Sequence, residues 1–399
     1  MQGWASSQIG QGQWGPSPEL HAEWKPIGTA RPAPLPGLGL ATAPEAGYAE
    51  RMSAKVHAKK APAEPDASTK KPLKQPPILF ERTQQLVTAL EKALGGTLLT
   101  YWNNPRGAVC HSDVVALYQA LERVGTSDTI YLFLKSDGGN GQASLRIVNL
   151  MRKHCKKLVA LVPLECASAA TMIALGANEI HMGPMAYLTA VDTSLTHDLS
   201  PVDRDNDRVS VSLDELRRVV RLWRSEKSSD RSNPYSHLYQ YVHPLVIGAV
   251  DRASSLSEML SQELLAYHLK DPRKINRIAQ NLNSRYPSHS YPILQEEAAR
   301  IGLNVKSMDA EVNSLLLDLN SLYSEMGQKA VTDFDEIRSH GNEITNILEV
   351  RGALLYFQLD KDWFYRAEER RWVTMNDNSG WRKTELVKGK PQTSVFHIS

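Results

Sequence analysis

The sequence predicts an α/β protein built on a mostly parallel sheet. Between Ile78 and Met182, apolar runs of strand length alternate with segments of helical periodicity. These runs are apolar throughout, as strands are when helices cover both faces of a parallel sheet. Before Ile78, Pro, Gly, Ala, Ser and Lys dominate, a composition that buries too little apolar surface to offset chain entropy. We therefore expect a disordered tail over residues 1–77, followed by a folded core.

The core elements follow one another in a regular order. Helical spacing predicts helices over residues 80–94, 113–124 and 144–154 and directly after Ser168. Apolar runs predict strands over residues 97–102, 129–134, 158–162 and 179–182. Strands that alternate with helices in this way are joined by right-handed crossovers, so we expect functional loops at the carboxyl ends of the strands.

The rest of the chain predicts more helices and then a β-rich end. Helices are expected over residues 213–223, 244–269 and 308–326. Short alternating segments at 352–358, 363–365 and 371–374, with turn residues at 376–380, predict a small β appendage. The expected domains are a tail (1–77), a core domain (78–305), and a helix with a small β-rich C-terminal appendage (306–399).

Composition excludes several classes of protein. Forty-six basic and 44 acidic residues give a formal charge of +2, so we expect no nucleic-acid partner. Three cysteines, Cys110, Cys155 and Cys166, without C-x-x-C spacing argue against a disulfide framework and a zinc site and favour a cytoplasmic location. Pro163 and Glu165 interrupt the one candidate membrane span. No cofactor, metal or integral membrane span is expected.

The N-terminus carries two expectations of its own. It lacks a basic segment followed by an apolar run, so a secretory signal is not expected. Met52, followed by Ser and Ala, offers an alternative translation start.

Two strand-end loops hold the residues best suited to chemistry. Residues 135–141 follow one strand, and Gly138 and Gly139 there allow positive φ and bring bare N–H groups against a ligand oxygen. Residues 163–172 follow the next strand and place Ser168 at a helix N-terminus, where the helix dipole favours negative charge. Ser168 has two open interpretations, a nucleophile or a simple N-cap.

Taken together, these loops resemble the serine dehydrogenase proteinase family of the ClpP/crotonase superfamily, relatives of signal peptide peptidase A. The matching residues are Ser136-Asp-Gly-Gly139, Val162-Pro163, Ala167-Ser168-Ala-Ala-Thr-Met-Ile-Ala-Leu175, Glu179-Ile180, Met182-Gly183, Val191-Asp192 and His289-Ser-Tyr-Pro-Ile293, the last leading to Glu297 through Val305. The resemblance covers roughly residues 96–305. It implies a ClpP/crotonase-like layered β-α-β core and a serine peptidase domain over 78–305.

The resemblance also implies a chemistry, that of an ATP-independent serine endopeptidase acting on a peptide or protein. Ser168 is the implied nucleophile, and the amides of Gly138 or Gly139 and of Ala169 are the implied oxyanion hole. Such donors are each worth about 10²- to 10³-fold in rate. A homo-oligomer is implied as well, because closed assemblies are common among these relatives.

A serine nucleophile needs a general base, and the sequence offers two candidates. Lys227, the first lysine after Ser168, stands at a point comparable to the Lys of the Lys-Ser pair in signal peptide peptidase A relatives. To act at neutral pH, its pKa must fall from about 10.4 toward 7 to 8. His197, followed by Asp198, suits a Ser-His-Asp arrangement. The alternative for each is an ordinary surface residue.

Three other side chains are expected to have structural roles. Cys166 is expected in the core, since free cysteines are often buried. His181 is expected to pack or to face solvent, and His289 to cap the late helix.

Two departures from the family pattern keep other functions open. Ser136-Asp137 replaces Thr-Pro before the glycines, and Leu188-Thr-Ala-Val-Asp192-Thr replaces Leu-Gly-Pro-x-Asp-Pro. Both changes weaken the case for binding a substrate strand beside the serine. The alternatives are a non-proteolytic crotonase-like acyl-CoA enzyme and a catalytically inactive oligomeric scaffold.

Overall fold

The computed structural model describes residues 71–204, 207–225 and 233–398, all within one compact unit. The helices are α1 (Phe80–Leu94), α2 (His111–Val124), α3 (Gly141–His154), α4 (Ala169–Leu175), α5 (Leu213–Ser225), α6 (Pro234–Leu238), α7 (Pro244–Ala266), α8 (Pro272–Ser284), α9 (Gln295–Ile301) and α10 (Ala310–Met326). Of the tail expected over residues 1–77, residues 1–70, with Met52, lie outside the described residues; residues 71–77 are described, and the Lys74 amide there donates to Thr332 Oγ1 (2.9 Å).

The strands begin after α1. They are β1 (Thr97–Asn103), β2 (Ser127–Lys135), β3 (Cys155–Val162), β4 (Glu165–Cys166), β5 (Glu179–Met182), β6 (Tyr187–Leu188), β7 (Ser194–Leu195), β8 (Val211–Ser212), β9 (Val305–Ser307), β10 (Ala330–Asp333), β11 (Arg338–Val350), β12 (Ala353–Arg366), β13 (Arg371–Asp377), β14 (Gly380–Val387) and β15 (Lys390–Phe396). The order of elements confirms a mixed α/β fold.

One large sheet organises the described part of the chain. Its main path runs β15-β14-β12-β11-β1-β2-β3-β5-β9, with β10 beside β11 and β13 beside β12. The pairings from β1 to β9 are parallel, as the alternation of strands and helices predicted. Beginning at the β1–β11 pair, the other half is antiparallel.

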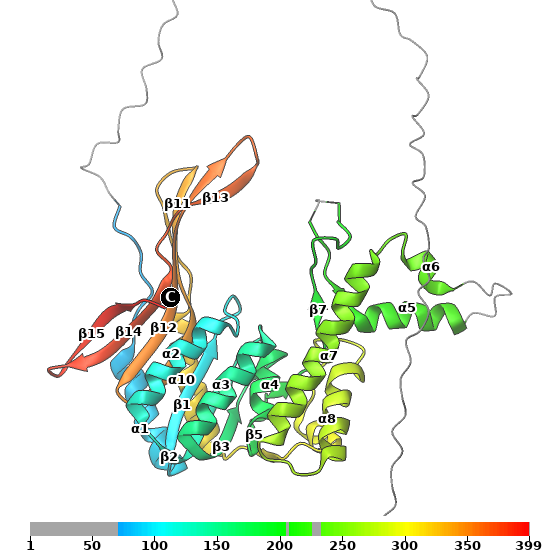
Figure 1. Cartoon of the computed structure of the whole chain (residues 1–399). Coiled ribbons are helices and arrows are strands. Elements are labelled where there is room, and N and C mark those ends of the chain that lie inside the picture. Colours follow the sequence, from blue (N-terminus) through cyan, green and yellow to red (C-terminus); the bar gives the residue numbers. More distant parts are fainter. Residues whose placement is uncertain (1–70, 205–206, 226–232, 399) are drawn as a thin grey trace, which may run out of the picture. The chain divides into compact units, whose positions relative to one another are not determined.

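Each face of the parallel half is covered by helices. Alternate residues of β1 enter different cores, because successive strand side chains point to opposite faces. Leu99 and Tyr101 pack with α2, α3 and α4, whereas Leu98 and Trp102 pack with α1 and α10. On the first face, α2, α3 and α4 lie side by side (Figure 1). The result is a helix–sheet–helix arrangement with two apolar cores.

The C-terminal strands differ from the expected appendage. β11 pairs with β1 in register, Thr100 opposite Glu349, so β10–β15 extend the central sheet. The expected division at residue 305 does not coincide with a break between compact units. The segments expected at 352–358 and 363–365 also form one continuous strand, β12.

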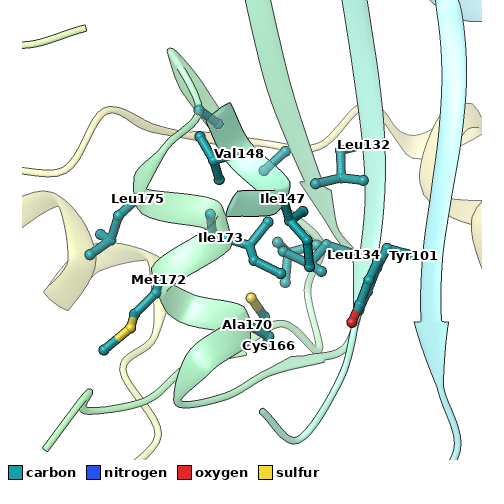
Figure 2. Close-up of a cluster of buried hydrophobic side chains, with 14 of the residues drawn as sticks. Tyr101, Leu132, Leu134, Ile147, Val148, Cys166, Ala170, Met172, Ile173 and Leu175 are labelled. Carbon is teal, nitrogen blue, oxygen red and sulfur yellow. The ribbon is translucent and has the colours of Figure 1, made fainter. Parts of the chain in front are cut away.

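Helix α4 is anchored deeply in the first core. Every residue of this seven-residue helix is buried, which explains its run of small and apolar side chains. In Figure 2, Cys166, Ala170 and Ile173 gather near Leu134, while Met172 points to the other side of the helix. Cys166 is fully buried, as expected, and burial raises the pKa of its thiol. Because α4 is packed on all sides, it fixes the position of the Ser168 backbone at its N-terminus.

Helices α5–α8 lie between β8 and α9 in sequence, and α7 builds one wall of the site described below. Val211, Leu213, Leu216, Val246 and Val250 form a small apolar cluster of their own that joins β8, α5 and α7. Across the three described ranges, no helix combines the length and the apolar character needed to cross a membrane.

Candidate active site

The two strand-end loops meet, as the parallel sheet predicts. The Ser136 amide donates to Glu165 O (3.1 Å), and the Ala167 amide donates to Ser136 O (2.9 Å). Gly138 has a φ of +108°, and a Cβ placed on it would lie 2.6 Å from Cβ of Ser168. Only glycine fits this close approach. The glycine at position 138 is therefore needed for the contact with Ser168 as well as for the turn.

Ser168 precedes α4 in a strained conformation. Its φ is 51° and its ψ is −116°, a region that residues with a side chain rarely adopt. Its side chain makes no cap hydrogen bond with the described start of α4, so the N-cap interpretation is not what the structure shows. Instead, its amide donates to Thr189 Oγ1 (2.8 Å). Strain of this kind persists only where surrounding contacts impose it, and it clusters at functional sites.

The amides of Gly138 and Gly139, the alternative oxyanion donors expected from the glycine loop, differ in their hydrogen bonds. The Gly138 amide donates to Ser136 Oγ (3.1 Å) and is therefore engaged. Val109 clamps the loop, its amide donating to Gly138 O (2.7 Å) and its carbonyl accepting from the Asn140 amide (2.8 Å). Among residues 71–204, 207–225 and 233–398, no acceptor is recorded for the amides of Gly139 and Ala169. In this respect the amides of Gly139 and Ala169 differ from the engaged amide of Gly138.

Ser168, Gly139 and Ala169 line a cavity of about 320 Å³. Its other walls come from residues 191–194 and from α7. The apolar part of the lining consists of Met172, Val191, Ala253, Leu256 and Leu260. The residues that carry this hydroxyl and these two amides thus share a cavity with an apolar wall.

A histidine and a carboxylate complete the same cavity. His289 Nδ1 lies 2.8 Å from Asp192 Oδ1, and both residues are in the lining. The hydrogen bond that His289 donates to Asp192 raises the pKa of His289 above its usual value. The bond also occupies Nδ1, so Nε2 is the ring nitrogen left for a reacting group. Serine, histidine and aspartate therefore share one cavity with the two amides.

Neither base expected from the sequence is placed in this cavity by the described residues. Lys227 is outside the described residues. His197 Nδ1 accepts from the Leu199 amide (3.0 Å), and Asp198 pairs with Arg208 (2.9 Å), so the structure does not bring this His-Asp pair to Ser168. His181 Nε2 lies 3.1 Å from Glu179 Oε2.

The role expected of His289 is wrong. The N-cap position of α9 is Leu294, so His289 does not cap that helix. The signal that points to the histidine and its partner was present in the sequence, because Val191-Asp192 and His289-Ser-Tyr-Pro-Ile293 both belong to the family motifs. Spacing alone does not join two residues 97 positions apart.

Comparisons with solved structures and with protein families give a few matches. Two solved structures of a membrane-bound stomatin-specific protease match at 15% and 16% identity. One, a serine-to-alanine mutant, has a TM-score of 0.33 and covers 56% of this chain and 83% of its own. The other, a lysine-to-alanine mutant with a substrate peptide, has a TM-score of 0.32 and covers 56% and 78%.

The remaining comparisons are with curated proteins and with protein families. No curated protein matches. The family model for Clp protease matches residues 103–187, a stretch that runs from the end of β1 to β6 and includes Gly138, Gly139, Ser168 and Ala169.

Proposed function

We propose that this chain is a serine peptidase in which Ser168 is the nucleophile and His289 the general base. One observation carries the proposal: Ser168, the free amides of Gly139 and Ala169, and the His289–Asp192 pair line the same cavity. The match of residues 103–187 to the Clp protease model supports it. The proposed chemistry uses only groups of this chain as nucleophile, base and oxyanion donors, and independence from ATP stays a prediction from the resemblance.

The proposed reaction begins with acylation. Ser168 Oγ attacks the peptide carbonyl while its proton passes to His289 Nε2. The amides of Gly139 and Ala169 donate to the oxyanion, which stabilises the transition state about 10²- to 10³-fold per donor. Asp192 holds the imidazole through Nδ1 and stabilises the imidazolium. His289 then protonates the leaving amine, and a water activated by the same base releases the acyl group.

Lys227 remains the second candidate base. The structural argument favours His289, because an imidazole already sits in the cavity with its carboxylate partner. A histidine also needs a far smaller change of pKa than a lysine to act near neutral pH. If His289 is the base, His289→Ala should be inactive, and if Lys227 is the base, Lys227→Ala should be inactive.

The cavity wall suits an apolar substrate side chain next to the scissile bond. Met172 and Leu260 are almost fully buried, and Leu256 and Val191 stand beside them. Burying a Leu-sized side chain against such a wall is worth roughly 1.5–3 kcal/mol.

The cytoplasmic location and the homo-oligomer expected from the sequence stay predictions.

A fluorophosphonate probe tests the nucleophile and the base together. We expect the purified protein to be labelled, Ser168→Ala to be unlabelled, and His289→Ala to react at least about 100-fold more slowly. Lys227→Ala and His197→Ala should react at the wild-type rate, and Ser321→Ala on α10 is the matched serine control. Strong slowing in Lys227→Ala with little change in His289→Ala would transfer the role of base to Lys227.

An unlabelled wild type would contradict the peptidase itself. Measurable binding of an acyl-CoA by that unlabelled protein would then favour the crotonase-like alternative. Neither labelling nor binding would favour the inactive scaffold.

A further inference from the structure

Thr189 is a buried residue that contacts the backbone of the proposed nucleophile. It is 2% exposed, and its Oγ1 accepts a hydrogen bond from the Ser168 amide (2.8 Å). The same oxygen donates its proton to the carbonyl of Ala190 (3.1 Å). Because the hydroxyl proton is committed to that carbonyl, a lone pair is left to face the Ser168 amide. The orientation of the Thr189 hydroxyl is therefore fixed on both sides.

A second threonine holds Thr189 in place. The Thr189 amide donates to Thr171 Oγ1 (3.2 Å), and Thr171 Oγ1 donates to the carbonyl of Cys166 (2.7 Å). Cys166 lies two residues before Ser168, and Thr171 lies in α4 directly after it. The contacts form a closed ring around the strained turn at Ser168, whose φ is 51°.

The segment that carries Thr189 also holds the other two members of the proposed triad. Leu188 exchanges two backbone hydrogen bonds with Ile293 (3.0 and 2.8 Å), four residues after His289. Asp192, three residues after Thr189, binds the His289 side chain directly. Residues 188–192 therefore contact all three parts of the site, which come from distant positions in the chain.

The outer part of this segment is anchored to the helices. The Val191 amide donates to Leu282 O in α8 (3.0 Å), and Ser257 Oγ in α7 donates to the Val191 carbonyl. These anchors hold residues 188–192 against α7 and α8. On the Ser168 side, Thr189 Oγ1 makes the direct link to the nucleophile.

We propose that Thr189 is a positioning residue that sets Ser168 in register with the His289–Asp192 pair. The inference rests on the proposed function and adds a residue to it. In the family pattern that residues 188–193 resemble, this position is glycine, which has no side-chain oxygen to make the link. Loss of its oxygen leaves the Ser168 amide without its acceptor and frees the strained turn to relax. The hydroxyl of Ser168 then moves relative to the base, while the apolar wall that binds substrate stays in place.

The test compares Thr189→Val, which removes the oxygen at nearly constant volume, with Thr189→Ser, which keeps it. Thr189→Ala removes the same oxygen without adding volume, in case the valine does not fit. Thr332→Val is the matched control, because Thr332 is buried in β10 and its Oγ1 also accepts a backbone amide, that of Lys74 (2.9 Å). Fluorophosphonate labelling rate, kcat, KM and melting temperature are measured for each variant.

We expect Thr189→Val and Thr189→Ala to lose about 10- to 100-fold in labelling rate and kcat, the scale of a small misplacement of a reacting atom. KM should stay within about two-fold, because substrate binding is unchanged. Thr189→Ser should retain most of the activity, and Thr332→Val should match the wild type.

Folded Thr189→Val and Thr189→Ala that are labelled at the wild-type rate would overturn the role of Thr189 and leave the peptidase intact. Equal losses in Thr189→Ser and Thr189→Val would overturn it too. An unlabelled wild type would overturn the proposed function and this inference together.

Discussion

Gly138 lies against Ser168 so closely that an added Cβ would be 2.6 Å from the serine Cβ and 2.8 Å from Ala167 O. Carbon atoms do not approach to this distance, so the two loops can meet only if residue 138 lacks a side chain. The positive φ of Gly138 adds to this requirement.

Gly138→Ala is therefore expected to abolish activity. The new methyl group forces the glycine loop away from Ser168 and displaces the neighbouring Gly139 amide, with a loss of at least about 100-fold in labelling rate. Gly248→Ala in α7 is the matched control, since its Cβ meets no atom within 4 Å. This control should keep full activity and gain up to about 1 kcal/mol of stability from helix propensity. An active Gly138→Ala would contradict the contact.

The pH dependence of the reaction should report His289. Asp192 raises the pKa of His289, and the base acts only when deprotonated. We expect kcat/KM to rise with pH through a midpoint above the usual histidine value of about 6.5. Asp192→Asn should move this midpoint to lower pH and lower the plateau by about 10²- to 10⁴-fold. A profile that is flat from pH 5 to 9 would exclude a histidine base.

The same pair makes a contribution to stability with a defined sign. Because the pKa of His289 is higher in the folded than in the unfolded protein, the Asp192 contact stabilises the fold fully below the unfolded pKa. The contribution is lost as the pH rises through the folded value. In Asp192→Asn this pH dependence should disappear from the free energy of unfolding.

Glu349 should make stability fall between about pH 4.5 and pH 7. Burial raises the pKa of its carboxyl to about 7, even though Thr83, Gln84 and Tyr323 donate hydrogen bonds to it. The unfolded carboxyl loses its proton near pH 4.5, so the folded state binds one more proton in this window and weakens as the pH rises. Urea unfolding of the wild type and of Glu349→Gln at pH 5 and pH 8 tests this. Between pH 5 and pH 8, the free energy of unfolding of Glu349→Gln should rise relative to that of the wild type by at most about 3 kcal/mol. The exposed Glu311→Gln should show no such relative rise.

Leu256 should influence which side chain the cavity accepts. It lies in the wall from α7, so Leu256→Glu introduces a carboxylate where an apolar group is expected to bind. We expect kcat/KM to fall for substrates with Leu or Met at the cleaved position and to rise for Lys or Arg. Met259→Glu is the control, because Met259 is 52% exposed on α7 and does not line the cavity. An unchanged preference in Leu256→Glu would show that the substrate side chain binds elsewhere.

The fold was predictable where periodicity was strong. Helical spacing gave α1 with its observed bounds, and the apolar runs gave β2, β3 and β5. Strand β11 was missed because buried polar residues, Asn342, Glu343, Asn346 and Glu349, interrupt its apolar pattern. Their hydrogen-bond partners lie far away in sequence, so nothing local indicates that they are buried.

The candidate site was predictable in its loops but not in its base. Gly139, Ser168 and Ala169 stand at strand ends, where parallel topology already places functional groups. His289 reaches the cavity only because residues 188–192 pair with the segment before α9. A contact that depends on tertiary pairing leaves no trace in local spacing, and nearby polar residues such as His197 then look equally suitable.

The antiparallel pairing of β11 with β1 has a consequence for how the protein is made. Glu349 donates its amide to Thr100 Oγ1, a contact between residues 249 positions apart. The chain must therefore be synthesised as far as β11 before β1 gains its second neighbour in the sheet. A nascent chain that has exposed only Ser168 and the glycines lacks this neighbour of β1, so we expect the proposed peptidase to stay inactive until β11 has been synthesised.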